Sequence, residues 1–311
     1  MPDRDNIDLL ALCRIKGVSW YLIAREAKRP GGLTRLLQGQ VTEESTEAAA
    51  ACRAVLEARP EMEGLREETE REVASARADG IRLTTVLDSD YPLNLQTIFN
   101  LPPFLFYTGE LDTENDARSI AVVGTREPSE EGLKLAGKMS RLLAERGITV
   151  LSGLARGIDT RAHIAALEAN GRTVSVLGSG LRCIYPKENK PLADRIAKHG
   201  AVVSQFWPDT APISYNFPRR NVTMSGMGQG TVVIEASSTS GAKMQARFAL
   251  EHGKQLFLLH RLVTQQKWAR GYMKRGAVEV KDVEDIASRL RSVDEIRSRT
   301  KMAQQLSLSL S

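Results

Sequence analysis

The sequence has few of the residue patterns that mark secreted, membrane or metal-binding proteins. Its three cysteines, Cys13, Cys52 and Cys183, are scattered without CxxC spacing, which predicts neither a disulfide framework nor a zinc site. The four histidines also lack ligand spacing, so we expect no metal site. No long apolar run or secretory leader occurs, so we expect a cytoplasmic protein without a membrane partner.

Common cofactor motifs are missing as well. The chain has no GxxxxGK[ST] phosphate loop, and the glycines at 178 and 180 lack the third glycine of a dinucleotide fingerprint. Asp159 and His163 are four residues apart and could form a general base and its orienter. The alternative is that Asp159 complements a helix dipole and that His163 hydrogen-bonds within the domain. We expect the alternative, and therefore no cofactor, no catalytic residue and no enzyme activity.

Positive charge is concentrated in the later part of the chain. The formal net charge is +5, but residues 1–80 contain 12 Lys/Arg against 15 Asp/Glu, which leaves 31 against 23 for residues 81–311. A basic excess of this kind favours an anionic partner with many charges.

Three short apolar runs dominate the segment from Ser119 to Gly180. They are Ile120–Val123, Ile148–Leu151 and Val174–Leu177, and each is followed by a glycine-bearing loop and then a helical pattern. Runs without polar alternation are typical of strands that are buried on both faces of a parallel sheet. The segment therefore predicts a β-α-β-α-β unit.

Each predicted strand end carries glycine and arginine. The three loops are Gly124-Thr125-Arg126, Ser152-Gly153-Leu154-Ala155-Arg156 and Gly178-Ser179-Gly180-Leu181-Arg182. Ligands of open parallel sheets bind in the crevice outside the carboxyl ends of the strands. Glycines let the backbone approach a ligand closely and main-chain N–H groups at helix starts attract anions, so the crevice is predicted to bind an anion.

The rest of the chain predicts two folded parts and a tail. Gly17 and Pro30-Gly31-Gly32 separate short helices in residues 1–80, which predicts a small all-helical domain that looks like SAM or helix-hairpin-helix domains. One long charged helix between Thr42 and Asp79 is expected to close this domain, with Gly80 as the helix stop. Two strands around residues 83–87 and 104–107 should extend the sheet at one edge. Residues 81–292 are expected to form an extended Rossmann-like α/β domain, a parallel sheet with helices on both faces, and residues 293–311 a tail that is unstructured from Arg297.

A long segment, Gln205–Arg220, is predicted to be irregular and functional. It leads into Phe217-Pro218-Arg219-Arg220-Asn221, and a later strand is followed by Ser240-Gly241 with Lys243 in the first turn of a helix. Six basic side chains then form a predicted line across the strand ends: Arg126, Arg156, Arg182, Arg219, Arg220 and Lys243. A line of cations suits a polynucleotide, whereas a single nucleotide needs only two or three. Phe217 is either a base-stacking platform or a core residue.

The order of these motifs resembles the DprA/Smf family. Similar to that family are, in sequence order, Val123-Gly124-Thr125-Arg126, Ser152–Asp159 with His163, Val176–Leu181 with Tyr185-Pro186, Phe217–Asn221, and Glu235-Ala236 followed by Ser240-Gly241. The match covers roughly residues 85 to 260, and several motifs in order are more specific than any one of them. The chain departs from the family pattern after Asn221 and no winged-helix domain follows, so a divergent member without that domain is expected.

The resemblance implies a protein that binds single-stranded DNA, forms a homodimer and passes the strand to RecA recombinase in natural transformation. The predicted DNA- and phosphate-binding residues are Gly124, Thr125, Arg126, Ser152, Gly153, Arg156, Gly178, Ser179, Gly180, Phe217, Arg219, Arg220, Asn221, Ser240, Gly241 and Lys243. The competing hypothesis is a nucleotide sensor or nucleotide phosphoribohydrolase of the related Rossmann-like group, for which Gly228–Glu235 is a faint echo of the PGGxGTxxE motif.

Overall fold

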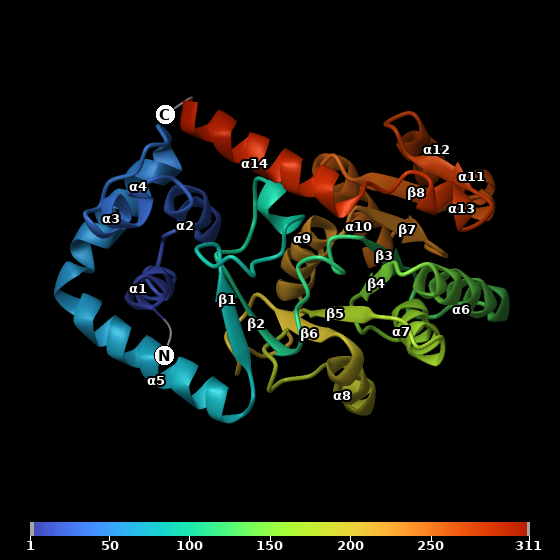
Figure 1. Cartoon of the computed structure of the whole chain (residues 1–311), viewed down its shortest axis with the longest axis horizontal. Helices are drawn as coiled ribbons and strands as arrows, with labels where there is room; N and C mark the ends of the chain where they lie inside the picture. The colour runs from blue at the N-terminus through green and yellow to red at the C-terminus, as the bar shows by residue number, and fades with distance from the viewer. Residues whose placement is uncertain (1–2, 310–311) are drawn as a thin grey trace.

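The computed structural model describes residues 3–309, with the backbone alone for 301 and 303–309. The chain begins with a helical domain at one side of the molecule (Figure 1). Its elements are α1 (Arg4–Leu12), α2 (Trp20–Ala27), α3 (Gly32–Leu37), α4 (Thr46–Glu57), the 3₁₀ turn η1 (Arg59–Glu61) and α5 (Met62–Ala78). Gly17 and Gly31 have positive φ in the turns, as their predicted breaker roles require.

The long closing helix predicted for this domain is instead two helices. Pro60 separates α4 from α5 because proline has no N–H to continue the helical hydrogen-bond ladder. The predicted stop at Gly80 is confirmed, since α5 ends at Ala78 and Gly80 has a φ of +74°.

A nine-stranded sheet forms the centre of the second domain. Its order is β1-β2-β6-β5-β4-β3-β7-β8-β9, and all neighbours are parallel except β1 with β2 and β2 with β6. The strands are β1 (Arg82–Thr85), β2 (Phe104–Gly109), β3 (Ser119–Val123), β4 (Thr149–Ser152), β5 (Thr173–Leu177), β6 (Ala201–Ser204), β7 (Gly230–Val233), β8 (Gln255–Leu259) and β9 (Val278–Val280). The predicted edge extension by β1 and β2 is confirmed.

Helices cover both faces of the sheet, as predicted. Ile120 and Val122 of β3 share an apolar core with α6 (Glu130–Glu145) and α7 (Ile158–Glu168), whereas Ala121 and Val123 share another with α9 (Asn216–Met227) and α10 (Gly241–Glu251). The alternation follows the period of two along a strand. The remaining helical elements are η2 (Leu95–Thr97), η3 (Lys187–Asn189), α8 (Lys190–His199), α11 (His260–Gln265), α12 (Lys267–Met273), α13 (Glu284–Ala287) and α14 (Val293–Ser309).

Two stretches expected to lack regular structure are helical. The last part of the loop Gln205–Arg220 belongs to α9, which starts at Asn216; Pro218 is tolerated there because first-turn N–H groups have no partner within the helix. The tail expected to be unstructured from Arg297 is part of α14, whose Ile296 and Thr300 are buried. Packing of these two side chains supports a helix that the polar composition of the segment disfavours.

The two domains share an apolar core. Trp20 of α2 lies 5.0 Å from Phe104 of β2 between ring centroids, and the Arg14 guanidinium lies 3.9 Å above the Trp207 ring. The Trp20 indole N–H also donates to the Cys13 carbonyl at 2.7 Å. Because these large aromatic groups lie across the junction, the helical domain has a fixed place against the sheet.

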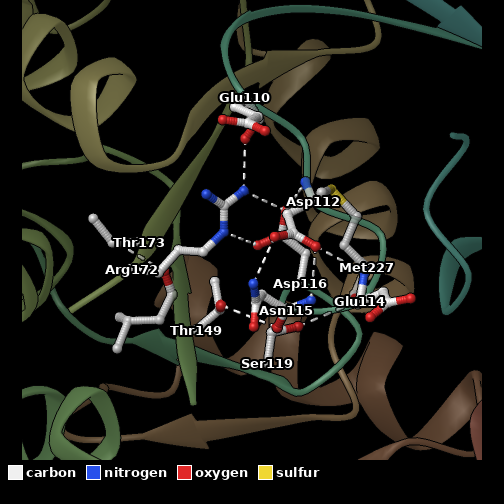
Figure 2. Close-up of polar contacts among 11 residues, drawn as sticks. Glu110, Asp112, Glu114, Asn115, Asp116, Ser119, Thr149, Arg172, Thr173 and Met227 are labelled. Atoms are coloured by element: carbon white, nitrogen blue, oxygen red, sulfur yellow. Dashed lines mark hydrogen bonds and ion pairs between the residues drawn. The ribbon is translucent and has the colours of Figure 1, made fainter. Parts of the chain in front are cut away.

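An ion pair fixes the connection from β2 to β3 (Figure 2). Arg172, just before β5, donates to both carboxylate oxygens of buried Asp116 at 2.7 Å and to the Glu110 carbonyl at 2.6 Å. Asp116 also accepts from the Asp112 amide at 2.9 Å, and the Thr149 hydroxyl donates to the Asn115 carbonyl at 3.1 Å. These bonds hold the connection against the amino ends of the central strands.

Replacing Arg172 with methionine should lower the free energy of unfolding by about 2 kcal/mol, because a buried carboxylate loses its cation. Burial already raises the pKa of Asp116, which Arg172 partly offsets. Without Arg172, the buried ionised carboxylate of Asp116 destabilises the folded state further. The difference in unfolding free energy between wild type and variant should therefore shrink as the pH falls through the pKa of Asp116 and its carboxyl becomes protonated. Urea titrations at several pH values check this, with Arg195→Met on the exposed face of α8 as the control. An equal deficit at all pH values would contradict the assignment.

Candidate nucleic-acid interface

A cavity of about 380 Å³ opens beyond the carboxyl end of β3. We call it the crevice cavity. It is lined by Val123, Gly124, Thr125, Arg126, Ala155, Asp159, Phe217, Arg220, Asn221, Met224, Ser237, Thr239, Ser240, Gly241, Ala242 and Gln245. Its position agrees with the general rule for ligand sites of open parallel sheets.

Two glycines create the space that the crevice needs. A Cβ atom at Gly124 would lie 2.4 Å from the Ile158 side chain, and one at Gly153 would lie 2.0 Å from the Arg220 guanidinium. A side chain at Gly124 would separate the β3 loop from the start of α7. A side chain at Gly153 would displace Arg220 from the floor of the cavity.

Three helices begin at the crevice cavity. Asp159 of α7, Phe217 of α9 and Gly241 of α10 line it, and each belongs to the first turn of its helix. The Ser240 hydroxyl caps α10 by accepting from the Ala242 amide at 3.1 Å. The amino ends of helices carry partial positive charge, so three of them favour an anion at this place.

Arg220 forms the buried, positive floor of the site. Its Nη1 donates to the Gly153 and Val176 carbonyls, at 2.5 and 2.8 Å, and its Nε donates to Asn221 at 3.0 Å. Burial lowers the pKa of Arg220 and raises that of Asp159, and the opposite charges of the two groups counteract both shifts. Arg220 therefore brings a desolvated cation close to the anion site, where its field is weakly screened.

Exposed Arg126 and an aromatic pair form the rim. The Arg126 guanidinium lies 5.6 Å from the centroid of the Phe217 ring, and Tyr185 lies 6.0 Å from Phe217 between centroids. Phe217 is half-buried because it packs over Gly178, where an added Cβ would lie 2.7 Å from its ring. Arg126 has no ion-pair partner within the described residues 3–309.

The structure brings half of the predicted site residues into the lining of the crevice cavity: Gly124, Thr125, Arg126, Phe217, Arg220, Asn221, Ser240 and Gly241. The other half lie outside the lining: Ser152, Gly153, Arg156, Gly178, Ser179, Gly180, Arg219 and Lys243. Several of these have internal roles. Ser152 donates to the Val122 carbonyl, Ser179 to the Cys183 carbonyl, and Lys243 to the Ser238 carbonyl.

The predicted line of six cations is interrupted. Arg219 stacks on Trp20, Phe206 and Tyr215 at 4.9 to 5.8 Å, which ties α9 to the helical domain. Arg182 pairs with Asp79 and Asp209, and Arg156 pairs with Glu188. These arginines bind carboxylates and aromatic rings of other segments. Their position after a strand end therefore did not predict their partners.

Sequence reasoning did not assign Thr239, Met224 and Gln245 to the site. Gln245 is buried one turn after Gly241 on α10, so helical periodicity from the Ser240-Gly241 start could have indicated it. Thr239 precedes the cap residue in a loop, and Met224 is a buried residue of α9, a helix that was not predicted. No local pattern marked either of them.

Asp159 and His163 behave as the structural interpretation predicted. Asp159 lies in the first turn of α7 and accepts from the Gly153 amide at 3.1 Å. His163 is fully buried, its Nδ1 lies 2.7 Å from the Thr173 hydroxyl, and burial lowers its pKa to about 3. The imidazole is therefore uncharged at neutral pH. Within the described part of the chain, no group of three or more His, Cys, Asp and Glu could hold a metal, and no helix is long and apolar enough to cross a membrane.

Comparisons with known proteins identify a family and relatives for this chain. The family profile described as DNA recombination-mediator protein A matches residues 82–291. The DNA processing protein DprA of Bacillus subtilis is 34% identical over 251 residues, which cover 80% of this chain and 82% of that protein. DprA of Streptococcus pneumoniae is 40% identical over 175 residues, 56% of this chain and 61% of that protein.

Solved structures show the same fold. The X-ray structure of S. pneumoniae DprA covers 94% of this chain and 99% of that chain, with a TM-score of 0.74 and 27% identity. A second structure describes the single-stranded DNA binding mode of DNA processing protein A from Helicobacter pylori. The match covers 70% of this chain and 97% of that chain, with a TM-score of 0.58 and 23% identity. At that identity the likeness concerns the fold alone.

Proposed function

The chain belongs to the DNA recombination-mediator protein A (DprA/Smf) family, and from this premise we propose that it binds single-stranded DNA at the crevice cavity and loads RecA recombinase onto it. The observation that carries the DNA part is the combination of two arginines, three helix starts and an exposed aromatic rim around one cavity. Phosphate is held by cations and main-chain N–H groups, and bases stack on aromatic rings.

The geometry suggests a role for each group. A backbone phosphate would lie over the starts of α7 and α10, with Arg126 above it and Arg220 below. The adjacent base would stack on Phe217 or Tyr185 at the rim, where Arg126 adds a cation–π contribution. Neither contact reads the edges of a base, so binding should tolerate any sequence.

RecA, the homodimer and the cellular process rest on family membership. We propose that the protein acts in the cytoplasm as a homodimer during recombination or natural transformation, without enzyme activity of its own. The chain spans 61% of the S. pneumoniae relative and 44% of the Smf protein of Synechocystis, so activities of those whole proteins come to it as proposals.

Salt should weaken this binding steeply. Each phosphate contact on single-stranded DNA contributes a slope of about −0.7 in log affinity against log salt, so about four contacts predict a fall of roughly fifty-fold between 50 and 200 mM salt. Fluorescence anisotropy of a labelled oligo-dT across this range measures the slope. Salt-independent binding, or a preference for duplex DNA, would contradict the proposal.

One observation favours a second candidate, a nucleotide sensor or phosphoribohydrolase. The volume of about 380 Å³ would hold a single nucleoside phosphate, and only two arginines line it. A strand-exchange assay with RecA inhibited by single-strand-binding protein, run beside a test for release of adenine from AMP, separates the two. Restored exchange without base release supports DNA loading; base release supports the hydrolase.

A further inference from the structure

A second cavity, of about 320 Å³, lies at the amino ends of β7 and β8, whereas the crevice cavity lies beyond the carboxyl ends of the strands. Gln229 and Lys254 line it, and they directly precede β7 and β8. Arg291, two residues before α14, closes the cavity together with Arg299 of that helix. Helix α14 contacts the η2 segment at this place. We call it the Lys254 cavity.

Positive charge accumulates in the Lys254 cavity without an acidic residue in its lining. Lys254, Arg291 and Arg299 line it, and no carboxylate does. Among the described residues, none of these three cations is in an ion pair. Outside the lining, Glu295 of α14 accepts from the amide and hydroxyl of Ser292, at 2.8 and 3.1 Å; these bonds and the charge of Arg291 lower its pKa. The lining itself carries an excess of positive charge, which favours an anion.

Hydrogen bonds fix the Lys254 ammonium and the backbone of Arg291. The Lys254 ammonium donates to the Asn94 carbonyl at 3.1 Å and to the Thr97 hydroxyl at 3.2 Å, which leaves one of its three N–H groups. Gln229 is buried and binds residue 291 twice, accepting from its amide at 2.8 Å and donating to its carbonyl at 3.0 Å. Arg299 lies about one turn after buried Ile296 and directly before buried Thr300 on α14.

Histidine contributes no charge at this place. His252 lies between the Ser225 hydroxyl and the Asn100 carboxamide, at 3.0 and 2.9 Å, and burial together with Lys254 lowers its pKa to about 4. Burial, Arg291 and Arg299 lower the pKa of Lys254 to about 7. An anion in the cavity would offset the repulsion from Arg291 and Arg299 and raise the pKa of Lys254 again.

We propose that the Lys254 cavity binds a phosphate group between Lys254, Arg291 and Arg299. Two arginines and a lysine can supply charge-assisted N–H donors to the oxygens of a phosphate. The site is separate from the crevice cavity because the two lie at opposite ends of the strands. The phosphate is either free inorganic phosphate or a backbone phosphate of a DNA strand that extends beyond the crevice.

Calorimetry with inorganic phosphate tests the site in an Arg126→Gln background, which weakens the crevice cavity as a competing anion site. Adding Arg291→Gln and Arg299→Gln should weaken phosphate binding about ten-fold or more, because two charge-assisted contacts are lost. Adding Arg195→Gln and Arg289→Gln removes the same charge from exposed positions outside the cavity and should change the affinity less than two-fold. The proposal would be overturned if the cavity pair and the control pair lost phosphate affinity equally. It would also be overturned if the protein with Arg126→Gln alone bound no phosphate.

Oligonucleotides distinguish the source of the phosphate. If it belongs to DNA, Arg291→Gln with Arg299→Gln should weaken a 40-nucleotide probe more than a 6-nucleotide probe that only fills the crevice. If this double variant binds both probes with wild-type affinity but has lost inorganic phosphate, the ligand is free phosphate. Melting temperatures of all variants should lie close to the wild type, since Arg291 and Arg299 are exposed.

Discussion

Replacing Arg126 with alanine should weaken binding of an oligo-dT probe by about ten- to a hundred-fold, the effect of one lost charge-assisted phosphate contact. The melting temperature should stay nearly unchanged, because Arg126 is exposed and has no ion-pair partner among the residues that the structure describes. Anisotropy titrations at fixed salt, together with thermal unfolding, measure both quantities.

Arg141→Ala is the matched control for this experiment. Arg141 is exposed on α6, pairs with Glu145 one turn away and does not line the crevice cavity. Its loss should leave DNA affinity within about two-fold, since surface ion pairs of this kind contribute little. If Arg126→Ala unfolds the protein, or binds DNA as well as Arg141→Ala does, Arg126 has no direct role in binding.

Replacing Arg220 with methionine should lower the free energy of unfolding by about 3 kcal/mol and also abolish most DNA binding. The substitution leaves the Gly153 and Val176 carbonyls without their donor and Asp159 without its nearby buried cation. Urea denaturation measures the stability, and the oligo-dT titration measures binding below the unfolding range.

A second substitution separates the charge effect from lost packing. Adding Asp159→Asn to Arg220→Met should recover part of the stability, because the uncompensated carboxylate is gone, while DNA binding stays weak. Arg247→Met, at an exposed surface pair on α10, controls for loss of an arginine. Strictly additive losses from Arg220→Met and Asp159→Asn would show that the two charges do not interact.

Local sequence determined much of the fold. The apolar runs at Ile120, Ile148 and Val174 predicted strands β3, β4 and β5 because strands buried on both faces must be apolar throughout. Gly80 predicted a helix end because only glycine adopts a positive φ without strain. Helix α9 was not predicted because Pro218 was interpreted as a loop residue, although proline fits the first turn of a helix.

The site was only partly predictable. Strand ends and helix starts correctly indicated where the loop of Gly124 and the cap at Ser240 converge, since topology places them together. They could not show that Arg219 would stack on Trp20 of another domain, or that Asp79 and Asp209 would pair with Arg182. Such partners are distant in the sequence and depend on how the domains pack.

Photocrosslinking tests the location of the DNA most directly. A 5-iododeoxyuridine oligonucleotide is irradiated with the protein, and mass spectrometry of the peptides identifies the crosslinked residue. The account predicts crosslinks at Phe217 or Tyr185, which Arg126→Ala reduces and Arg141→Ala does not. Crosslinks confined to aromatic residues away from the crevice, such as Phe248 or Tyr272, would show that DNA binds elsewhere and would contradict the account.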